Sequence, residues 1–352
     1  MSLNVTTISA DELIPGMILA KEVMHNGKVL LREGSIVNED IIERLRNIFI
    51  LDKLSVYISA DVIEKNTKEA EIEKVEQAFQ EVSNELENLY SKIDTLSENN
   101  IADLREFAWK IQKQFKSSEL IMNSVLFHGN EGDCIYRHGV NVAAISALIG
   151  KWLGYDSDQI NDLVYAGLLH DFGMTKLPKE IQNKPDLELQ IDSDEVKEHV
   201  RIGYEAVKSL NCLNKRVICG ILMHHERCDG SGYPIGALRD KIHPFAKIIA
   251  IADEIDVLNS NEKLKEEKGA FHVLKVIKEK SLNLLDYKYS RVFLEHISNF
   301  YVGEEVTLNN GDVAKILQIN IDDIENSLLL KDGDFINLKI NKDLHIKELI
   351  AK

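Results

Sequence analysis

The residues of this chain that could do chemistry are histidines and aspartates at five places between positions 138 and 253. Two of these places directly follow apolar runs of helical pattern, 163–169 and 217–223, and a third lies inside another such run, 248–256. Burying an ionised carboxylate in an apolar helix is costly unless the group is paired or binds a metal ion. The side chains concerned are His138, His170, Asp171, His199, His224, His225 and Asp253.

Imidazole and carboxylate ligands together suit manganese, iron, zinc, cobalt or nickel better than calcium or magnesium alone. Seven such side chains are more than one tetrahedral zinc ion needs, so the set predicts two divalent transition-metal ions that share a bridging carboxylate. Asp171 is the natural bridge, because it directly follows His170 in the chain. Any one of these histidines alone would more often be a hydrogen-bonded core or surface residue. The prediction therefore rests on the whole ordered set.

Charge and composition narrow the classes of function. The chain has 352 residues and a net charge of −16, which disfavours binding to polymeric nucleic acid because such binding depends on lysine and arginine. The sequence does not open with a basic segment followed by an apolar run, and no stretch nears about 18 uninterrupted apolar residues, so we expect neither a signal peptide nor a membrane span. The four cysteines have no CxxC spacing, which is typical of reduced thiols. We therefore expect a cytoplasmic protein.

The elements that must position these side chains are mainly helical. Helical periodicity dominates the middle of the chain, whereas short β-like runs and tight turns such as Asn26-Gly27 and Asp332-Gly333 occur near its two ends. The expected parts are a small α+β module at 1–60, a helical or coiled-coil connector at 61–119, a helical catalytic domain at 120–299 and a small β module at 300–352.

Apolar residues of the connector alternate in steps of four and three, which is the pattern of a coiled-coil seam. One interpretation is a homodimer formed through the stripe at 70–97. The other, which we favour, is an antiparallel helical hairpin within one chain, with a turn at 97–100 and a second helix through Phe115. The stripe consists of Val75, Phe79, Val82, Leu86, Leu89, Ile93 and Leu96.

Several motifs of the central region resemble those of the HD-GYP family, a bacterial branch of the HD phosphohydrolases. The resemblance covers about 133–260 and implies an HD-type helical domain. The most specific motif reads His-His-Glu-Arg-Cys-Asp-Gly-Ser-Gly-Tyr-Pro and begins at His224. The matching stretches are 136–138, 168–173, 178–185, 199–203 and 224–234, followed by Ala252-Asp253.

The resemblance implies metal-dependent hydrolysis of cyclic di-GMP to pGpG and/or GMP, by a hydroxide that bridges two metal ions. Iron and manganese are the usual metals in the family. The seven side chains named above take the role of metal ligands by this resemblance, and His170 and Asp171 take a catalytic role. The implied contacts with the cyclic dinucleotide are Lys176, Asp229, Gly230, Tyr233 and Lys265.

The chain departs from the family pattern at positions that would contact phosphate. Met174 stands where the family has a lysine, with Lys176 two residues later, and Glu262 stands at an arginine position. Cys134 replaces a glutamate that helps to hold a third metal ion in some members, so we expect two ions. Two alternatives stay open: a catalytically weak cyclic-dinucleotide sensor or scaffold, and an HD phosphohydrolase that acts on another cyclic dinucleotide.

Overall fold

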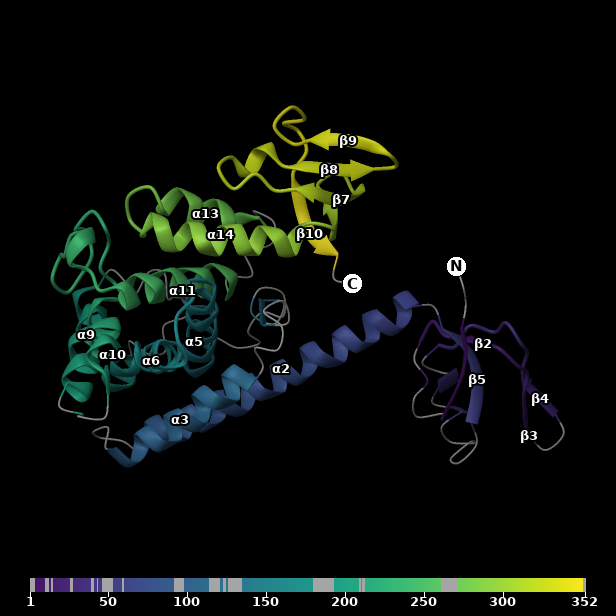
Figure 1. Cartoon of the computed structure of the whole chain (residues 1–352), viewed down its shortest axis with the longest axis horizontal. Coiled ribbons are helices and arrows are strands. Elements are labelled where there is room, and N and C mark those ends of the chain that lie inside the picture. Colours follow the sequence, from purple (N-terminus) through teal and green to yellow (C-terminus); the bar gives the residue numbers. More distant parts are fainter. Residues whose placement is uncertain are drawn as a thin grey trace. The chain divides into compact units, whose positions relative to one another are not determined.

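Figure 1 shows the computed structural model of the chain, which divides into two compact units, residues 1–74 and 75–352. Helix α2, Ala60–Ser91, runs across this boundary. The structure describes residues 4–9, 13, 15–25, 28–38, 41–42, 44–45, 53–58, 60–91, 98–113, 121–122, 125, 135–179, 193–208, 210, 213–260 and 271–350.

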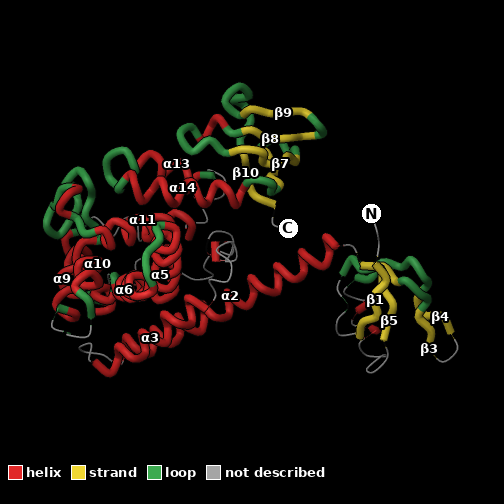
Figure 2. The backbone as a smooth tube through the Cα atoms, in the orientation of Figure 1, coloured by secondary structure: helices red, strands yellow, loops and turns green. Residues whose placement is uncertain are grey.

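The first unit contains, among its described residues, two small antiparallel sheets (Figure 2). Strand β5 lies between β1 and β2 in one sheet, and β3 pairs with β4 in the other, with His25 opposite Lys28. This pairing confirms the hairpin predicted from Asn26-Gly27. Leu19 is fully buried in the apolar core of the unit. The strands are β1 Asn4–Ser9, β2 Ile18–Leu19, β3 Val23–His25, β4 Lys28–Leu31 and β5 Lys53–Ile58.

In the second unit, α2 lies beside α3, Glu98–Lys113, and Lys110 Nζ of α3 is 2.7 Å from a carboxylate oxygen of Glu85 (Figures 1 and 2). The apolar stripe of α2 is buried within the single chain from Val75 to Leu89. This burial agrees with the hairpin interpretation, because that part of the stripe is covered without a second copy. The residues between the two helices, 92–97, lie outside the described part of the chain.

The second unit is mainly helical, which confirms the predicted fold class. Helices α5, α6, α10 and α11 pack against one another, and α9 packs against α10 and the short helix η2. None of the described helices combines the length and the apolar character that crossing a bilayer requires. The bounds are α5 Ile135–Trp152, α6 Ser157–Leu169, η2 Phe172–Lys176, α9 Asp194–Val207, α10 Lys215–Met223, η3 Arg239–Lys241, α11 Pro244–Ser260, α13 His272–Lys280 and α14 Tyr287–Tyr301.

The C-terminal part of this unit is one antiparallel sheet with the strand order β10-β6-β7-β8-β9. Residues of β6 alternate in burial, so that Val306 and Leu308 face the core. Strands β6 to β9 agree with the predicted β module. Strand β10 also lies within residues 300–352, at which the sequence predicts this module. The strands are β6 Glu305–Leu308, β7 Val313–Gln318, β8 Leu328–Lys331, β9 Asp334–Asn337 and β10 Ile346–Ile350, with η4 at Ile324–Asn326.

Candidate metal centre

The structure brings the seven candidate ligands together at one place in the second unit, although separate helical segments carry them. His170 is the C-cap residue of α6, which ends at Leu169, and His224 is the C-cap residue of α10, which ends at Met223. Asp171 is the N-cap residue of η2. The others are His138 on α5, His199 on α9, Asp253 on α11, and His225 directly after His224.

Asp171 lies between two groups of histidines, and each of its carboxylate oxygens faces one group. Asp171 Oδ1 lies 3.2 Å from His199 Nε2 and 3.6 Å from His224 Nε2. Asp171 Oδ2 lies 3.5 Å from His170 Nε2 and 3.8 Å from His138 Nε2. A carboxylate in this position can be shared by two metal ions.

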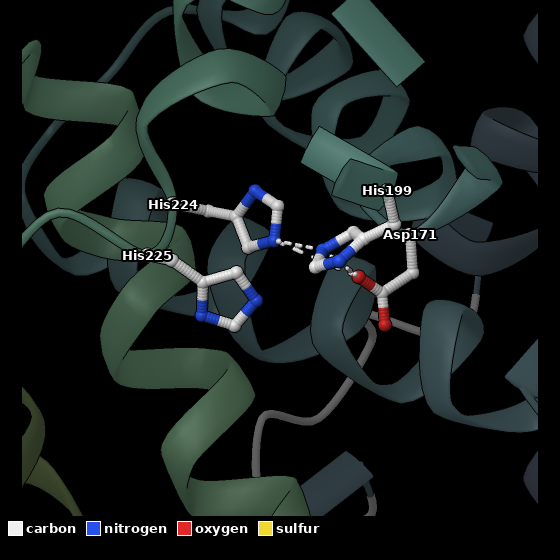
Figure 3. Close-up of side chains that lie close together, drawn as sticks. All are labelled: Asp171, His199, His224 and His225. Atoms are coloured by element: carbon white, nitrogen blue, oxygen red, sulfur yellow. Dashed lines mark hydrogen bonds and ion pairs between the residues drawn. The ribbon is translucent and has the colours of Figure 1, made fainter. Parts of the chain in front are cut away.

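We call the two groups the first and the second subsite. Asp253 belongs to the first, because its Oδ1 lies 3.3 Å from His138 Nε2. Figure 3 shows the side chains of the second subsite, with His199 and His224 directed toward Asp171. The first subsite is His138, His170, Asp171 and Asp253, and the second is Asp171, His199, His224 and His225.

Hydrogen bonds to the main chain fix three of the imidazole rings. In each ring Nδ1 faces the carbonyl oxygen of the residue three positions earlier. Because a carbonyl oxygen can only accept, Nδ1 carries the proton and the lone pair of Nε2 is available to a metal ion. The bonds run from His170 to Gly167, from His199 to Val196 and from His224 to Ile221, at 2.7, 2.6 and 2.7 Å.

His138 is fixed by a side chain that the sequence analysis did not select. Its Nδ1 donates to Asp256 Oδ2 at 2.8 Å, and Asp256 Oδ1 accepts from Asn141 Nδ2 at 2.8 Å. Asp256 lies three residues after Asp253 on α11, so both carboxylates lie on one side of an apolar helix. That spacing is the signal from which its role could have been predicted.

Burial and mutual contact set the charges of the cluster. Burial alone would raise the pKa of Asp171, but the neighbouring imidazoles, His170 foremost, hold the pKa well below its usual range. Burial lowers the pKa of His170 to about 4 and that of His225 well below its usual value. Burial acts in the same direction on His138, but hydrogen bonds to carboxylates, that of Asp253 foremost, raise its pKa well above the usual value. An ionised Asp171 and neutral His170 and His225 are in the protonation states that metal ligands need.

The cluster also contains a buried polar atom that no described group of the protein satisfies. Within the described part of the chain, Nδ1 of the buried His225 has no hydrogen-bond partner. A buried polar atom without a partner is costly, and Figure 3 shows the other nitrogen of this ring, Nε2, turned toward His199 and Asp171. Together with the imidazole and carboxylate chemistry of the cluster, this atom supports a site for transition-metal ions.

A loop held by Glu226 forms one wall of the site. The buried carboxylate of Glu226 accepts from Ile235 N through Oε1 and from Ala237 N through Oε2, each at 2.7 Å. The same loop carries Tyr233, whose ring stacks on that of His225 with a centroid distance of 4.6 Å. The loop therefore contacts the second subsite directly.

The predicted substrate contacts within this loop also have structural roles. Asp229 is exposed, and its Oδ1 accepts from Ser231 N at 3.0 Å and from Ser231 Oγ at 2.7 Å. Gly230 has a φ of +84°, a backbone conformation that favours glycine. Asp229 and Gly230 thus shape the turn that leads to Tyr233.

The structure describes two of the positions that bear on phosphate binding, Met174 and Lys176. Met174 is buried in an apolar cluster with Leu177 and Val196, so that position offers no charge. Lys176 is exposed at the end of η2. Lys265, like Glu262 and Cys134, lies outside the residues that the structure describes.

Lys197 is a cation beside this wall that the sequence analysis did not single out. It lies on α9, two residues before His199, and its ammonium group is 5.7 Å from the centroid of the Tyr233 ring. Its position depends on how α9 packs against the loop, which sequence spacing alone does not reveal.

We expect Glu226→Gln to loosen this loop. The amide nitrogen of glutamine would face a backbone N–H where a carboxylate oxygen now accepts, and a hydrogen bond to a charged group contributes about 1.5–3 kcal/mol. Amide hydrogen exchange at Ile235 and Ala237 should therefore become about 10- to 100-fold faster. Glu254→Gln, which changes a carboxylate that pairs with Lys280, is the control and should leave both amides unchanged. Unchanged exchange in Glu226→Gln would show that its carboxylate does not hold the loop.

Comparisons with known proteins agree with this geometry. Residues 116–288 match the family model of the HD domain. A cyclic di-GMP phosphodiesterase of Pseudomonas aeruginosa is 28% identical over 183 residues, which cover 52% of this chain and 44% of that protein. A 3'3'-cGAMP-specific phosphodiesterase of Vibrio cholerae is 28% identical over 190 residues, which cover 52% of this chain and 43% of that protein. The match thus spans less than half the length of these curated relatives.

A solved structure shares the fold. It is that of an HDG"Y"P protein from Bdellovibrio bacteriovorus, which superposes with a TM-score of 0.53 at 17% sequence identity. The superposition covers 84% of this chain and 99% of that one. At this identity the likeness concerns the fold alone.

Proposed function

Because this chain belongs to the HD-GYP family of HD-domain proteins, we propose that it hydrolyses cyclic di-GMP to pGpG and/or GMP. The observation that supports this function most directly is the cluster in which Asp171 is shared between two histidine subsites. Metal ions held at such a site would neutralise phosphate charge in a chain whose net charge is −16.

In this proposal the two subsites hold two divalent transition-metal ions, with iron or manganese as the expected metals. The first subsite offers two imidazoles and two carboxylates, and the second offers three imidazoles and one carboxylate. When bound, such ions acidify a water molecule and bind the non-bridging oxygens of the phosphodiester.

In this reaction the residues of the chain bind the metal ions and orient the substrate. Asp171 places the two subsites side by side, and His170 keeps Nε2 directed into the first because Gly167 O holds its Nδ1 proton. Tyr233 presents an aromatic ring on which a guanine can stack, and Lys197 adds a positive charge beside it. Asp229, Gly230, Lys176 and Lys265 remain proposed contacts with the substrate.

Specific observations support the two alternative functions. The burial of Met174 removes a charge that the family uses against phosphate, which favours a sensor or scaffold with weak catalysis. The relative from Vibrio cholerae acts on 3'3'-cGAMP, which favours a different cyclic dinucleotide as substrate.

Product analysis separates these functions. The protein is purified without oxygen, its metal content is measured, and it is incubated with cyclic di-GMP or 3'3'-cGAMP before chromatography of the nucleotides. We expect linear product from cyclic di-GMP with the wild type, and none with His170→Ala or after removal of the metal by a chelator. Binding without product would support the sensor, and faster cleavage of 3'3'-cGAMP would support the other substrate.

A further inference from the structure

A continuous chain of hydrogen bonds joins helix α2 to the first subsite. Glu76 Oε2 on α2 lies 2.8 Å from an Nη atom of Arg137, whose Nε donates to Asn141 Oδ1 at 3.1 Å. Asn141 Nδ2 donates to Asp256 Oδ1 at 2.8 Å, and Asp256 Oδ2 accepts from His138 Nδ1 at 2.8 Å. The chain therefore crosses from α2 through α5 to α11 and ends on a candidate metal ligand.

The chain has a fixed direction because each member has a restricted choice of roles. Arg137 can only donate, so the oxygen of Asn141 faces it and the amide N–H of Asn141 faces Asp256. Asp256 accepts on both oxygens, so Nδ1 of His138 must carry the proton. Nε2 of His138 is thereby directed into the first subsite, where it can bind a metal ion once it gives up its proton.

The middle of this chain is shielded from solvent. The exposed fractions are 9% for Arg137, 2% for Asn141 and 1% for Asp256. Hydrogen bonds between groups so deeply buried are stronger than in water, and a missing partner there is costly. We therefore expect a substitution at one member to disturb the hydrogen bonds of the next.

Helix α2 also contacts the segment that carries the shared carboxylate. The hydroxyl of Tyr90 donates to the carbonyl oxygen of Leu168, two residues before His170. The ring of Tyr90 packs edge-on against Phe172, directly after Asp171, with a centroid distance of 4.9 Å. One residue of α2 thus contacts both sides of the His170-Asp171 pair.

The rings of the second subsite are held differently. His199 and His224 are fixed by carbonyl oxygens of α9 and α10, the helices that carry them. His225 stacks on Tyr233 of the adjacent loop. Asp171, which both subsites share, adds its Oδ1 at 3.2 Å from His199 Nε2 and 3.6 Å from His224 Nε2. Among the described residues, none of these contacts to the three rings comes from α2.

We propose that α2 positions His138 of the first subsite and no imidazole of the second, acting through Glu76, Asn141 and Asp256 as positioning residues. The inference rests on the two-ion site of the proposed function. It assigns a positioning role to a helix that contributes no ligand to either subsite. The affinity for the ion at the first subsite then depends on this chain of hydrogen bonds, whereas the affinity for the other ion does not.

Metal titration of the full chain tests this inference without any substrate. Mn²⁺ is titrated into metal-free protein by calorimetry for the wild type, Asp256→Asn, Glu76→Gln and Tyr90→Phe. Loss of a residue that orients a ligand weakens metal binding by about 10- to 100-fold, which we expect at one site for Asp256→Asn. Glu76→Gln should weaken the same site by about 2- to 10-fold, and the other site should keep its wild-type affinity in both of these variants. Tyr90→Phe, beside the shared Asp171, should weaken both sites.

Asp162→Asn is the matched control, because Asp162 forms a buried ion pair with Arg216 between α6 and α10. It should leave both affinities unchanged. Cobalt supplies a second readout: in Asp256→Asn the visible absorption of one Co²⁺ ion should change while that of the other stays constant. Glu76 is partly exposed and far along the chain from the ligands, so its variant gives a result even where Asp256→Asn does not fold.

Equal weakening of both sites by Asp256→Asn or Glu76→Gln, or no weakening by either variant, would overturn the inference. So would a wild type that binds a single ion, although hydrolysis could still be found with that protein. A protein that binds two ions with the expected dependence on α2, but cleaves no cyclic dinucleotide, would contradict the proposed function and support the inference.

Discussion

Asp171→Asn is expected to empty both subsites and to abolish hydrolysis. Asp171 is the one residue common to the two groups, with Oδ1 facing the second subsite and Oδ2 the first. An amide keeps the shape of the side chain but replaces one ligand oxygen with an NH₂ group and removes the negative charge. We expect metal content to fall from about two ions to fewer than one per chain, and kcat/KM to fall by at least about 10³-fold, which corresponds to about 4 kcal/mol.

Elemental analysis and steady-state kinetics of the same preparation check this prediction. Asp158→Asn is the control, because it makes the same change of charge at the exposed start of the helix that leads to Asp171. It should retain both ions and the full rate. A variant at Asp171 that kept two ions and a rate near that of the wild type would contradict the bridging role.

Gly173→Ala is expected to displace α9 from the site. A Cβ at Gly173 would lie 1.9 Å from the carbonyl oxygen of His199 and 2.9 Å from Gly203 N, both of which are main-chain atoms. Main-chain atoms of a packed helix cannot rotate away as a side chain can, so α9 itself must shift. We expect a loss of about 1–3 kcal/mol in the free energy of unfolding, together with weaker metal binding at the second subsite.

Denaturant unfolding and metal titration measure these two effects. The matched control is Gly203→Ala on the facing helix, where the nearest atom to an added Cβ is Ile221 Cγ2 at 3.5 Å, an ordinary contact. Because alanine is favoured over glycine inside a helix, that variant should be neutral or stabilised by up to about 1 kcal/mol. A stable Gly173→Ala protein with unchanged metal binding would show that α9 tolerates a methyl group there.

The positions of the candidate ligands could be predicted because a polar side chain at the end of an apolar helical run is visible in the local sequence. His170 and His224 each end an apolar run, and that pattern is visible in the sequence alone. The partners that orient the ligands were missed for the opposite reason. Asn141 and Glu76 join the site only because α5 contacts both α2 and α11, and no local pattern specifies that packing. Asp256 differs, because its spacing from Asp253 on one helix was a usable signal.

The apolar stripe of the connector shows the same limit. Steps of four and three indicate a helix with one apolar face, but they do not say which element covers it. In the structure Phe79 and Leu86 are fully buried within one chain. A Cβ on Gly139 of α5 would lie 3.6 Å from Leu86 Cδ2, so α5 covers part of the stripe. The helix that covers a stripe is decided by tertiary packing.

The contacts of α2 limit how far the protein can be truncated without loss of function. A fragment that began at residue 116, where the HD domain match begins, would keep every candidate ligand but lose Glu76 and Tyr90. Because α2 contains neither glycine nor proline, its main-chain hydrogen bonds run without a break from Ala60 to Ser91, past the end of the first unit at Lys74. In the proposed two-ion site, the frame that orients His138 is therefore built partly from sequence outside the matched domain, and we expect the smallest fully competent fragment to be longer than that domain.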